Sequence, residues 1–566
     1  MPPIRPARPF AGAAPPRRGT TPFRAALLLG VAALLGAAPA AAQRGDPQIS
    51  MAPHHPTFRN VAQGSYTHSV STPAYVSLDQ PRSATLFYAS GQAAPQGFVQ
   101  FDVTDPSTDR AHAVSAWVRD SNGAWLTPEV VWRTNPSGGR TQRLALRWDA
   151  SAMATGAYPV TISVFFHWYG NGSHHYQGAS ATTRVLVVNE RNSDFGAGWS
   201  LAGHQRLHLS GASTNRGLVL TEGDGTAKFF LGWDNNGDYV SPEGDFTTLR
   251  YYSASGTNPA YYVRRYPDGT QVLFHADGRM DYSVDRFGNV NKVQYYNNTP
   301  TVVFLTDPTN KSLYFAYEST GKLRWIENPG PDGRDTYFSV NAAGALTSVQ
   351  AADGSYAFRG TYHANHALDL WHDEAGQEWD LGYNEHSELS RMVAPQVAST
   401  DAGNTRPATD VVGPMSAVLP SSAGPCGSSI GSGGCPAPWL APEAVRLSVK
   451  DPRGHITMMA VDRFGAPTRV EAPLGGVTTI ERNTLGQVVR TVSPSGHTVR
   501  NTWVGLELRK TEDETTNTTV EIEYEPLYHQ PKRVWGSGTR ESWSFYNAAG
   551  QLDSTRTGSS ESRSTR

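Results

Sequence analysis

The best candidates for binding an ion are oxygen-bearing side chains spaced two residues apart. They are Asp234, Asn236 and Asp238, in the run Asp-Asn-Asn-Gly-Asp. Alternating carboxylate and amide oxygens suit calcium, which takes oxygen ligands. An EF-hand loop, however, would need a glycine that is missing from its place here, and a closing Glu where Asp245 stands. We therefore favour a hydrogen-bonded Asx turn and keep a structural calcium ion as the alternative.

The two cysteines, Cys426 and Cys435, bracket a short loop of small residues. We predict a disulfide between them, because the export signal described below implies an oxidising compartment. Closing so short a loop would contribute roughly 2–3 kcal/mol through chain entropy. Two free thiols are the alternative, and a metal pair is disfavoured because no histidine lies close enough in sequence.

Two further groupings resemble catalytic or metal motifs but lie in the wrong context. Residues 427–431 match G-x-S-x-G, yet a nucleophile elbow needs a strand before it and a helix after it, not a cysteine-bounded loop. His363, His366 and His372 form the densest histidine cluster, but a strand would place the first two on opposite faces. No P-loop, HExxH or CxxC occurs. We predict that the chain is not an enzyme and keep a secreted polysaccharide-active enzyme as the weakest alternative, since paired carboxylates cannot be recognised from spacing.

Adjacent tyrosines occur three times, as Tyr251-Tyr252, Tyr261-Tyr262 and Tyr295-Tyr296. In a strand, neighbouring rings point to opposite faces, so one of each pair could face solvent. Exposed tyrosines can stack on sugar rings, but they also pair across strands for stability alone. We favour the structural role.

The elements that would carry these residues are strands. Among the 566 residues are 55 Gly, 39 Pro, 24 Tyr and 14 Trp, with only 17% charged, which favours frequent turns and half-buried pleated surfaces. The chain is too long for a single core. Its net charge of −2 gives no field that would draw it to nucleic acid or to an anionic membrane.

The first 42 residues predict export. Basic residues precede an apolar run at 25–42 that ends in small residues, which is typical of a secretory signal peptide cleaved after Ala42. An uncleaved anchor is the alternative. No later segment is apolar enough to cross a bilayer, so we expect a secreted or cell-surface protein with no membrane insertion after cleavage.

Residues 65–190 contain short alternating strands separated by turns about 10–15 residues apart, which predicts an immunoglobulin-like β-sandwich. Trp117, Trp132 and Trp148 are its candidate core residues.

Beyond residue 190 the chain repeats one unit: an apolar or aromatic residue, Asp or Asn, two variable residues, Gly, one variable residue and an apolar residue. Asp or Asn can bond the backbone two residues on, and Gly can adopt the left-handed conformation, so each unit predicts a hairpin turn. The turn residues are Asp285 and Gly288, Asn341 and Gly344, Asp462 and Gly465, Asn483 and Gly486, and Asn547 and Gly550. One hairpin is marginal alone, so neighbouring units must stack into a long antiparallel ribbon.

These units, their spacing near 21 residues and the preceding segment FGAGWSLAG resemble RHS/YD-repeat proteins across about 190–560. The resemblance implies a β-sheet that spirals into a shell, in bacterial secreted or surface proteins that often hold a toxin domain or bind carbohydrate. The Asp-Pro-x-Gly motif that precedes the toxin in such proteins occurs here only at Asp451–Gly454, before further repeats. We interpret it as one more turn, and no toxin domain is visible.

The predicted protein is thus all-β, with an immunoglobulin-like sandwich followed by an RHS/YD-repeat ribbon forming a partial shell. Its predicted divisions are a signal peptide (1–42), a flexible lead-in (43–64), the sandwich (65–190), repeats (191–394), a Pro/Gly/Ser-rich insert with the disulfide (395–441), further repeats (442–555) and a disordered tail (556–566). We predict an exported structural protein that encapsulates or presents a cargo or toxin polypeptide. The alternative is a cell-surface adhesin that binds carbohydrate.

Overall fold

The computed structural model confirms an all-β fold, with one short helix among the residues that it describes. It describes residues 64–104, 111–134, 141–170, 173–209, 217–233, 236–297, 299–329, 334–384, 387–396, 406–413, 447–461, 466–537, 539–558 and 560–563. Within these ranges no helix is both long enough and apolar enough to cross a bilayer.

The first eleven strands and the helix precede the ribbon. They are β1 (Thr67–Ser71), β2 (Tyr75–Ser77), β3 (Gln80–Arg82), β4 (Thr85–Ala89), α3 (Ser90–Ala93), β5 (Gln96–Thr104), β6 (Ala113–Asp120), β7 (Val130–Arg133), β8 (Thr141–Asp149), β9 (Gly156–Gly170), β10 (Ser173–Val187) and β11 (Trp199–Leu201).

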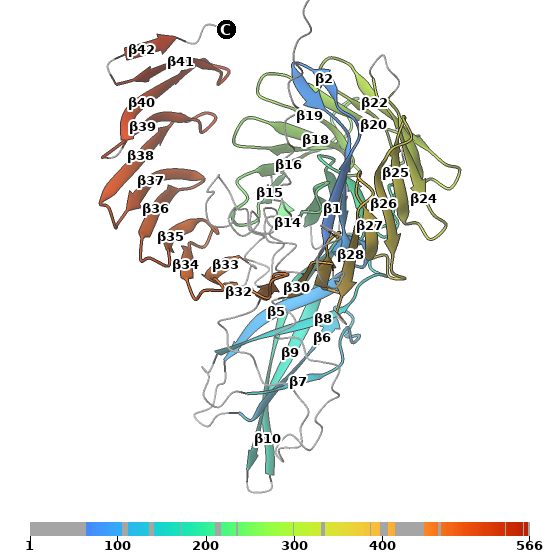
Figure 1. Cartoon of the computed structure of the whole chain (residues 1–566), viewed down its shortest axis with the longest axis vertical. Helices are drawn as coiled ribbons and strands as arrows, with labels where there is room; N and C mark the ends of the chain where they lie inside the picture. Colours follow the sequence, from blue (N-terminus) through green and yellow to red (C-terminus); the bar gives the residue numbers. More distant parts are fainter. Residues whose placement is uncertain are drawn as a thin grey trace, which may run out of the picture. The chain divides into compact units, whose positions relative to one another are not determined.

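The remaining strands form one antiparallel sheet of 31 strands in chain order, β12 to β42 (Figure 1). Its first part is β12 (Arg206–Leu209), β13 (Leu218–Thr221), β14 (Ala227–Trp233), β15 (Asp238–Val240), β16 (Thr248–Tyr252), β17 (Tyr261–Arg265), β18 (Gln271–His275), β19 (Met280–Val284), β20 (Val290–Tyr295), β21 (Val302–Thr306), β22 (Ser312–Tyr317), β23 (Leu323–Glu327), β24 (Thr336–Val340), β25 (Leu346–Ala351), β26 (Tyr356–Tyr362), β27 (Leu368–His372), β28 (Glu378–Tyr383), β29 (Leu389–Val393) and β30 (Ala408–Val412). Its second part is β31 (Leu447–Lys450), β32 (Ile456–Val461), β33 (Pro467–Glu471), β34 (Val477–Arg482), β35 (Val488–Val492), β36 (Thr498–Val504), β37 (Glu507–Asp513), β38 (Thr518–Tyr524), β39 (Pro531–Gly536), β40 (Thr539–Tyr546), β41 (Leu552–Thr557) and β42 (Ser560–Arg563). The predicted antiparallel ribbon is confirmed.

Two small sheets precede the ribbon, with strand orders β10-β9-β6-β7 and β5-β8. Alternate residues of β6 and β9 enter a shared core that also buries Trp132 and Trp148. Trp117 is not in this core, contrary to our prediction. It alternates with the buried Ala116 and Val118 of β6, so its ring lies on the opposite face of the sheet. The immunoglobulin-like connectivity of this unit stays a prediction.

The repeat units form the turns between ribbon strands. In the turn after β19, the Gly288 N–H donates to the Asp285 carbonyl, and Gly288 has φ +84°. The Asp285 carboxylate accepts from the main-chain N–H groups of Phe287 and Asn289, both at 2.9 Å. Only a residue tolerant of the left-handed region fits the glycine position, and only a short acceptor reaches those two donors.

A tyrosine at the end of alternate strands caps the preceding hairpin. Its hydroxyl donates to a main-chain carbonyl at or near the start of the strand just before its own, 15 or 16 positions earlier. The pairs are Tyr295 to Met280, Tyr317 to Val302, Tyr362 to Leu346, Tyr383 to Leu368, Tyr524 to Leu508 and Tyr546 to Pro531. At each of these tyrosines the pairing of its strand with the following strand shifts register.

A separate three-stranded sheet, β1-β4-β11, lies against the ribbon. The Tyr88 hydroxyl accepts from the Leu368 N–H at 2.8 Å and donates to the His366 carbonyl at 3.0 Å. His68 contacts the rings of Phe358 and Trp371, with centroids 5.3 and 4.4 Å away. Strands β1 and β4 therefore cover the ribbon rather than extend the two small sheets.

The segment Phe195–Trp199 links the small sheets to the ribbon through close main-chain contacts. The Ala197 N–H donates to the Gly344 carbonyl at 2.7 Å. Gly196 has φ +110°, and a Cβ there would lie 2.9 Å from the Leu346 Cβ. The glycine is needed both for its conformation and for this approach.

One face of the ribbon is buried over most of its length. The register places the buried Leu381, Met392, Leu447, Met459, Val470 and Ile480 on a single face, which also bears the capping tyrosines. We call it the tyrosine face. From β35 onward the same face carries Val499, Trp503, Val520, Ile522 and Val534. In β35–β42, as far as the structure describes them, no hydrophobic side chain is fully buried.

Candidate functional site

The predicted calcium ligands are only partly described. Asp234 lies outside the described residues, whereas Asn236 and Asp238 lie at the start of β15. Asp238 faces Arg250 of β16, with 3.7 Å between carboxylate and guanidinium. Among the described residues, no three acidic, histidine or cysteine side chains gather in a way that could hold a metal ion.

Of the predicted turn residues, eight are described. Gly344, Gly486 and Gly550 share the positive φ of Gly288, and their N–H groups donate to the carbonyls of Asn341, Asn483 and Asn547. Asp462, Gly465 and both cysteines, Cys426 and Cys435, lie outside the described residues. The Asp451–Gly454 segment forms the turn between β31 and β32, with Gly454 at φ +85°.

The three clustered histidines do not converge. His363 faces Asp369 at 3.2 Å, and His372 faces Glu378 at 3.5 Å. His366 occupies a turn at φ +67°. The three histidines therefore have different neighbours on the ribbon and do not form a common site.

The paired tyrosines contact each other across strands. Tyr252 stacks on Tyr261 with a centroid distance of 4.8 Å, and Tyr251 packs beside Tyr262 at 5.0 Å on the other face. Cross-strand aromatic pairs of this kind stabilise a sheet. Tyr296 remains 60% exposed.

The strongest candidate for a binding surface lies on the small sheet, opposite its core. There the rings of Trp125, Trp117, Phe165 and Tyr176 form a row across β6, β9 and β10, which we call the aromatic row. Trp117 stacks on Phe165 with centroids 5.1 Å apart and planes 9° apart. Trp125 lies 5.4 Å from Trp117, and Tyr176 lies 5.9 Å from Phe165.

The outer members of the row face solvent. Trp125 is 54% exposed and Tyr176 is 65% exposed, which is unusual for large aromatic side chains. The row spans the sheet because the register pairs Phe165 with Ser115 on one side and with Gly178 on the other. A Cβ at Gly178 would lie 2.4 Å from the Phe165 ring, so the glycine makes room for it.

Polar groups flank the aromatic row. The Arg119 guanidinium lies 4.3 Å from the Trp125 ring centroid. Ser115 bonds the His167 ring at 2.9 Å, and His167 bonds His174 at 3.0 Å. Burial lowers the pKa of His167, and the neighbouring His174 lowers it further. The surface thus offers flat apolar rings next to hydrogen-bonding side chains and the Arg119 guanidinium.

Such a surface suits ligands with one apolar face and polar edges. Aromatic faces carry negative charge density and attract the positive hydrogens of C–H bonds, while the flanking groups can bond hydroxyls. Sequence reasoning missed this row and placed one of its members in the core. Its sequence signal is the alternation of large aromatic with small residues on the non-core face of adjacent strands.

No protein-family model matches the sequence, and no curated protein matches it. Several solved structures are similar at low identity. A crystal structure of TcdB2–TccC3 with Cdc42 is 12% identical, covering 75% of this chain and 23% of the solved chain at a TM-score of 0.31. A crystal structure of TcdB2–TccC3 is 12% identical. The match covers 87% of this chain and 27% of the solved chain, at a TM-score of 0.27. A structure of a Photorhabdus luminescens Tc holotoxin pore is 11% identical. The match covers 87% of this chain and 22% of the solved chain, at a TM-score of 0.26. The chain spans about a quarter of the length of these solved chains.

Proposed function

We propose that the chain is an exported scaffold whose ribbon forms part of an RHS-like β-shell, and that the uncovered part of the tyrosine face contacts a polypeptide cargo. The observation that supports this most is the change in burial along one continuous face. Through Ile480 that face is buried, whereas Val520, Ile522 and Val534 on the same face are only half-buried. A sheet this long normally covers its apolar face, so the uncovered stretch is the natural contact surface.

The two faces of the uncovered part differ in chemistry, which favours the tyrosine face for this contact. The opposite face carries alternating charges, including the ion pairs of Lys510 with Glu512 at 3.0 Å and of Arg533 with Glu541 at 2.7 Å. Charged, paired side chains favour contact with water. The tyrosine face instead presents branched apolar side chains and the Trp503 ring, with less charge. A polypeptide with exposed apolar groups would bind there.

A protease-protection assay tests the proposal. An unstructured reporter polypeptide, fused after residue 566 of the full chain, should be cut more slowly than the free reporter. Val534→Asp, on the tyrosine face, should remove most of the protection, whereas Trp535→Asp, on the opposite face of the same strand, should keep it. Equal cutting of fused and free reporter would refute the proposal. Electron microscopy provides a second check, because a compact globule in place of a one-layer wall would also refute it.

A second candidate function, carbohydrate binding at a cell surface, is favoured by the aromatic row. The exposed Trp125 and Tyr176 rings lie beside hydrogen-bonding side chains, Arg119 and His174, which suits the C–H face and hydroxyl edges of sugar rings. On a glycan array, the full chain should bind at least one polysaccharide class. Trp125→Ala should weaken that binding about tenfold or more. The matched Trp535→Ala variant on the ribbon should bind like the unaltered protein; equal losses in both variants would contradict the assignment.

A further inference from the structure

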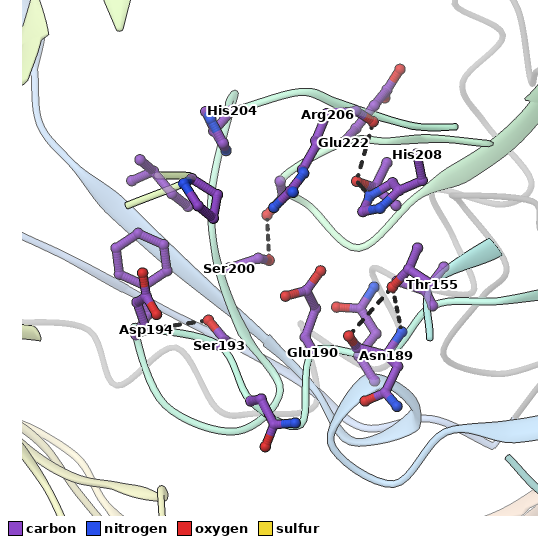
Figure 2. Close-up of a pocket in the computed structure, with 18 of the residues that line it drawn as sticks. Thr155, Asn189, Glu190, Ser193, Asp194, Ser200, His204, Arg206, His208 and Glu222 are labelled. Atoms are coloured by element: carbon purple, nitrogen blue, oxygen red, sulfur yellow. Dashed lines mark hydrogen bonds between the residues drawn. The ribbon is translucent and has the colours of Figure 1, made fainter. Parts of the chain in front are cut away.

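A cavity of about 430 Å³ lies where the segment after β10 meets β11, β12 and β13. It falls within the range of roughly 300–1,000 Å³ found for small-molecule sites. Figure 2 shows Arg206 and Glu190 extending toward each other from different walls of this cavity, with His204 and His208 beside Arg206. Neither the aromatic row nor the tyrosine face includes these residues.

Within the part of the chain that the structure describes, neither the Arg206 guanidinium nor the Glu190 carboxylate forms a hydrogen bond or a close ion pair. Enclosed charges are normally paired, because removing them from water is costly. A guanidinium and a carboxylate held apart in one cavity therefore need a ligand or ordered water between them.

The two histidines of the cavity are already engaged. His204 bonds the Tyr295 hydroxyl at 2.9 Å, and because that hydroxyl donates to the Met280 carbonyl, the His204 Nε2 is the donor. His208 bonds the Thr221 hydroxyl at 2.9 Å. Burial, with a further contribution from Arg206, lowers the pKa of His204 to about 4 and that of His208 to about 3, so both rings are neutral near pH 7.

The two remaining carboxylates on the wall also have partners. Glu222 pairs with Arg264 at 2.6 Å, and Asp194 accepts from the Thr301 hydroxyl at 2.8 Å. Among the described residues of the wall, Arg206 and Glu190 are thus the charged side chains that form no hydrogen bond and no close ion pair.

The side chain of Gln92 is a second, independent indication of a ligand, because its buried amide oxygen lacks a hydrogen-bond donor among the described residues. Its side chain lines the cavity and is 3% exposed, and its Nε2 donates to the Gly225 carbonyl at 3.0 Å. Its Oε1 has no donor among the described residues. The main-chain carbonyl of Gln92 accepts from the Glu190 N–H, so the two residues are neighbours on the wall of the cavity. A ligand donor next to Glu190 could satisfy both, directly or through water.

We propose that this cavity binds a small zwitterion of the α-amino acid type, whose carboxylate pairs with Arg206 and whose ammonium pairs with Glu190. Arg206 suits a carboxylate because its guanidinium offers a planar pair of donors. The ammonium has three donors, enough for Glu190 and for the Gln92 side chain. A ligand with only one of the two charges would leave the other group unpaired.

Calorimetric titration of the full chain with a panel of L-amino acids at about pH 8.5 tests the proposal. At least one amino acid should bind, and it should raise the Tm of the protein as a ligand of the folded state does. Its amide, which lacks the negative charge, and its deaminated acid, which lacks the ammonium, should each bind about 10- to 100-fold more weakly. No binding at about 10 mM of any amino acid would overturn the proposal.

Two variants assign the binding to this cavity. Arg206→Met and Glu190→Gln should each weaken binding about 10- to 100-fold, while Arg453→Met, on an exposed turn, should leave it unchanged. Circular dichroism and Tm measured without ligand show whether each variant is folded. Should Arg206→Met fail to fold, the Glu190→Gln variant and the two one-charge analogues still decide the question. Binding that survives both cavity variants, or that does not distinguish the analogues, would overturn the proposal.

Discussion

The Glu190 carboxyl should make the protein less stable at alkaline pH, and Glu190→Gln should remove that effect. Burial raises the pKa of Glu190 from its usual 4.5 to about 7; the nearby Asp194 adds to the rise, while Arg206 opposes it. In the unfolded chain the carboxyl ionises near its usual value. Between these two values the folded protein holds a proton that the unfolded chain has released, so raising the pH favours unfolding.

The size of the effect follows from the difference between the two pKa values. A rise from 4.5 to about 7 corresponds, at about 1.36 kcal/mol per unit, to a cost of about 3 kcal/mol above the folded-state pKa. The cost is absent below about pH 4, where both states are protonated, and grows between the two pKa values. Glu190 borders the cavity and retains intermediate exposure, so water there reduces the penalty and makes this figure an upper limit.

Urea unfolding of the unaltered protein and of Glu190→Gln, at about pH 5 and about pH 8.5, measures this cost. The variant's advantage in unfolding free energy should increase with pH by about 2–3 kcal/mol. The titrations of His204 and His208 largely cancel in the difference in unfolding free energy between the two proteins, because both proteins contain these histidines. Glu374→Gln, on an exposed turn, is the matched control and should show no pH-dependent difference. An advantage of Glu190→Gln that stays constant with pH, or that declines as pH rises, would refute the argument.

Three other substitutions probe the fold. Tyr383→Phe should lower stability by about 1–2 kcal/mol, because it leaves a main-chain acceptor unsatisfied, while the more exposed Tyr546→Phe should cost less than half as much in the same urea titration. Burial lowers the pKa of His68 from 6.5 to about 4. The unfolding free energy should therefore be highest above about pH 6.5 and fall by up to about 3 kcal/mol as the pH falls to 4. In Tm measured against pH, His68→Phe should show a smaller decline. Gly178→Val should displace the Phe165 ring and lower stability by about 1–3 kcal/mol, with loss of any glycan binding; unchanged Tm and binding would show that the ring can move aside freely.

The ribbon could be predicted from the sequence because the residues that form each turn are close together in the chain. Each Asp or Asn lies within four residues of the N–H groups that it accepts from, and each turn glycine needs no distant contact to adopt its φ. Five or so residues therefore specify a hairpin, and repetition specifies the sheet. The capping role of the tyrosines could not be predicted, because their acceptors lie 15 or 16 residues upstream, outside the turn that one repeat unit specifies.

The covering of the ribbon could not be predicted from such local patterns. Tyr88 contacts residues nearly 280 positions away, and His68 enters a ring cluster on β26 and β27. Nothing in the strand-like sequence around these residues distinguishes a strand of the small sheets from a strand that packs on the ribbon. The cavity shows the same limit, since Glu190 and Arg206 belong to no motif and are significant only because both lack partners in one enclosed space.

The covering also explains why the two parts of the ribbon differ in composition. Where β1, β4 and β11 lie against the sheet, the tyrosine face carries large side chains such as Phe358 and Leu381, both almost fully buried. Beyond Ile480, where hydrophobic side chains are no longer fully buried, the same positions are taken by Thr491, Asn501 and Thr511 as well as by Val520 and Ile522, so the face is also less apolar there. A purely solvent-facing surface would not need the remaining valines and isoleucine, and a permanently covered one would not need the threonines and asparagine. This intermediate composition is typical of surfaces that meet a partner without a permanent interface, which favours a cargo that is held rather than fused into the core.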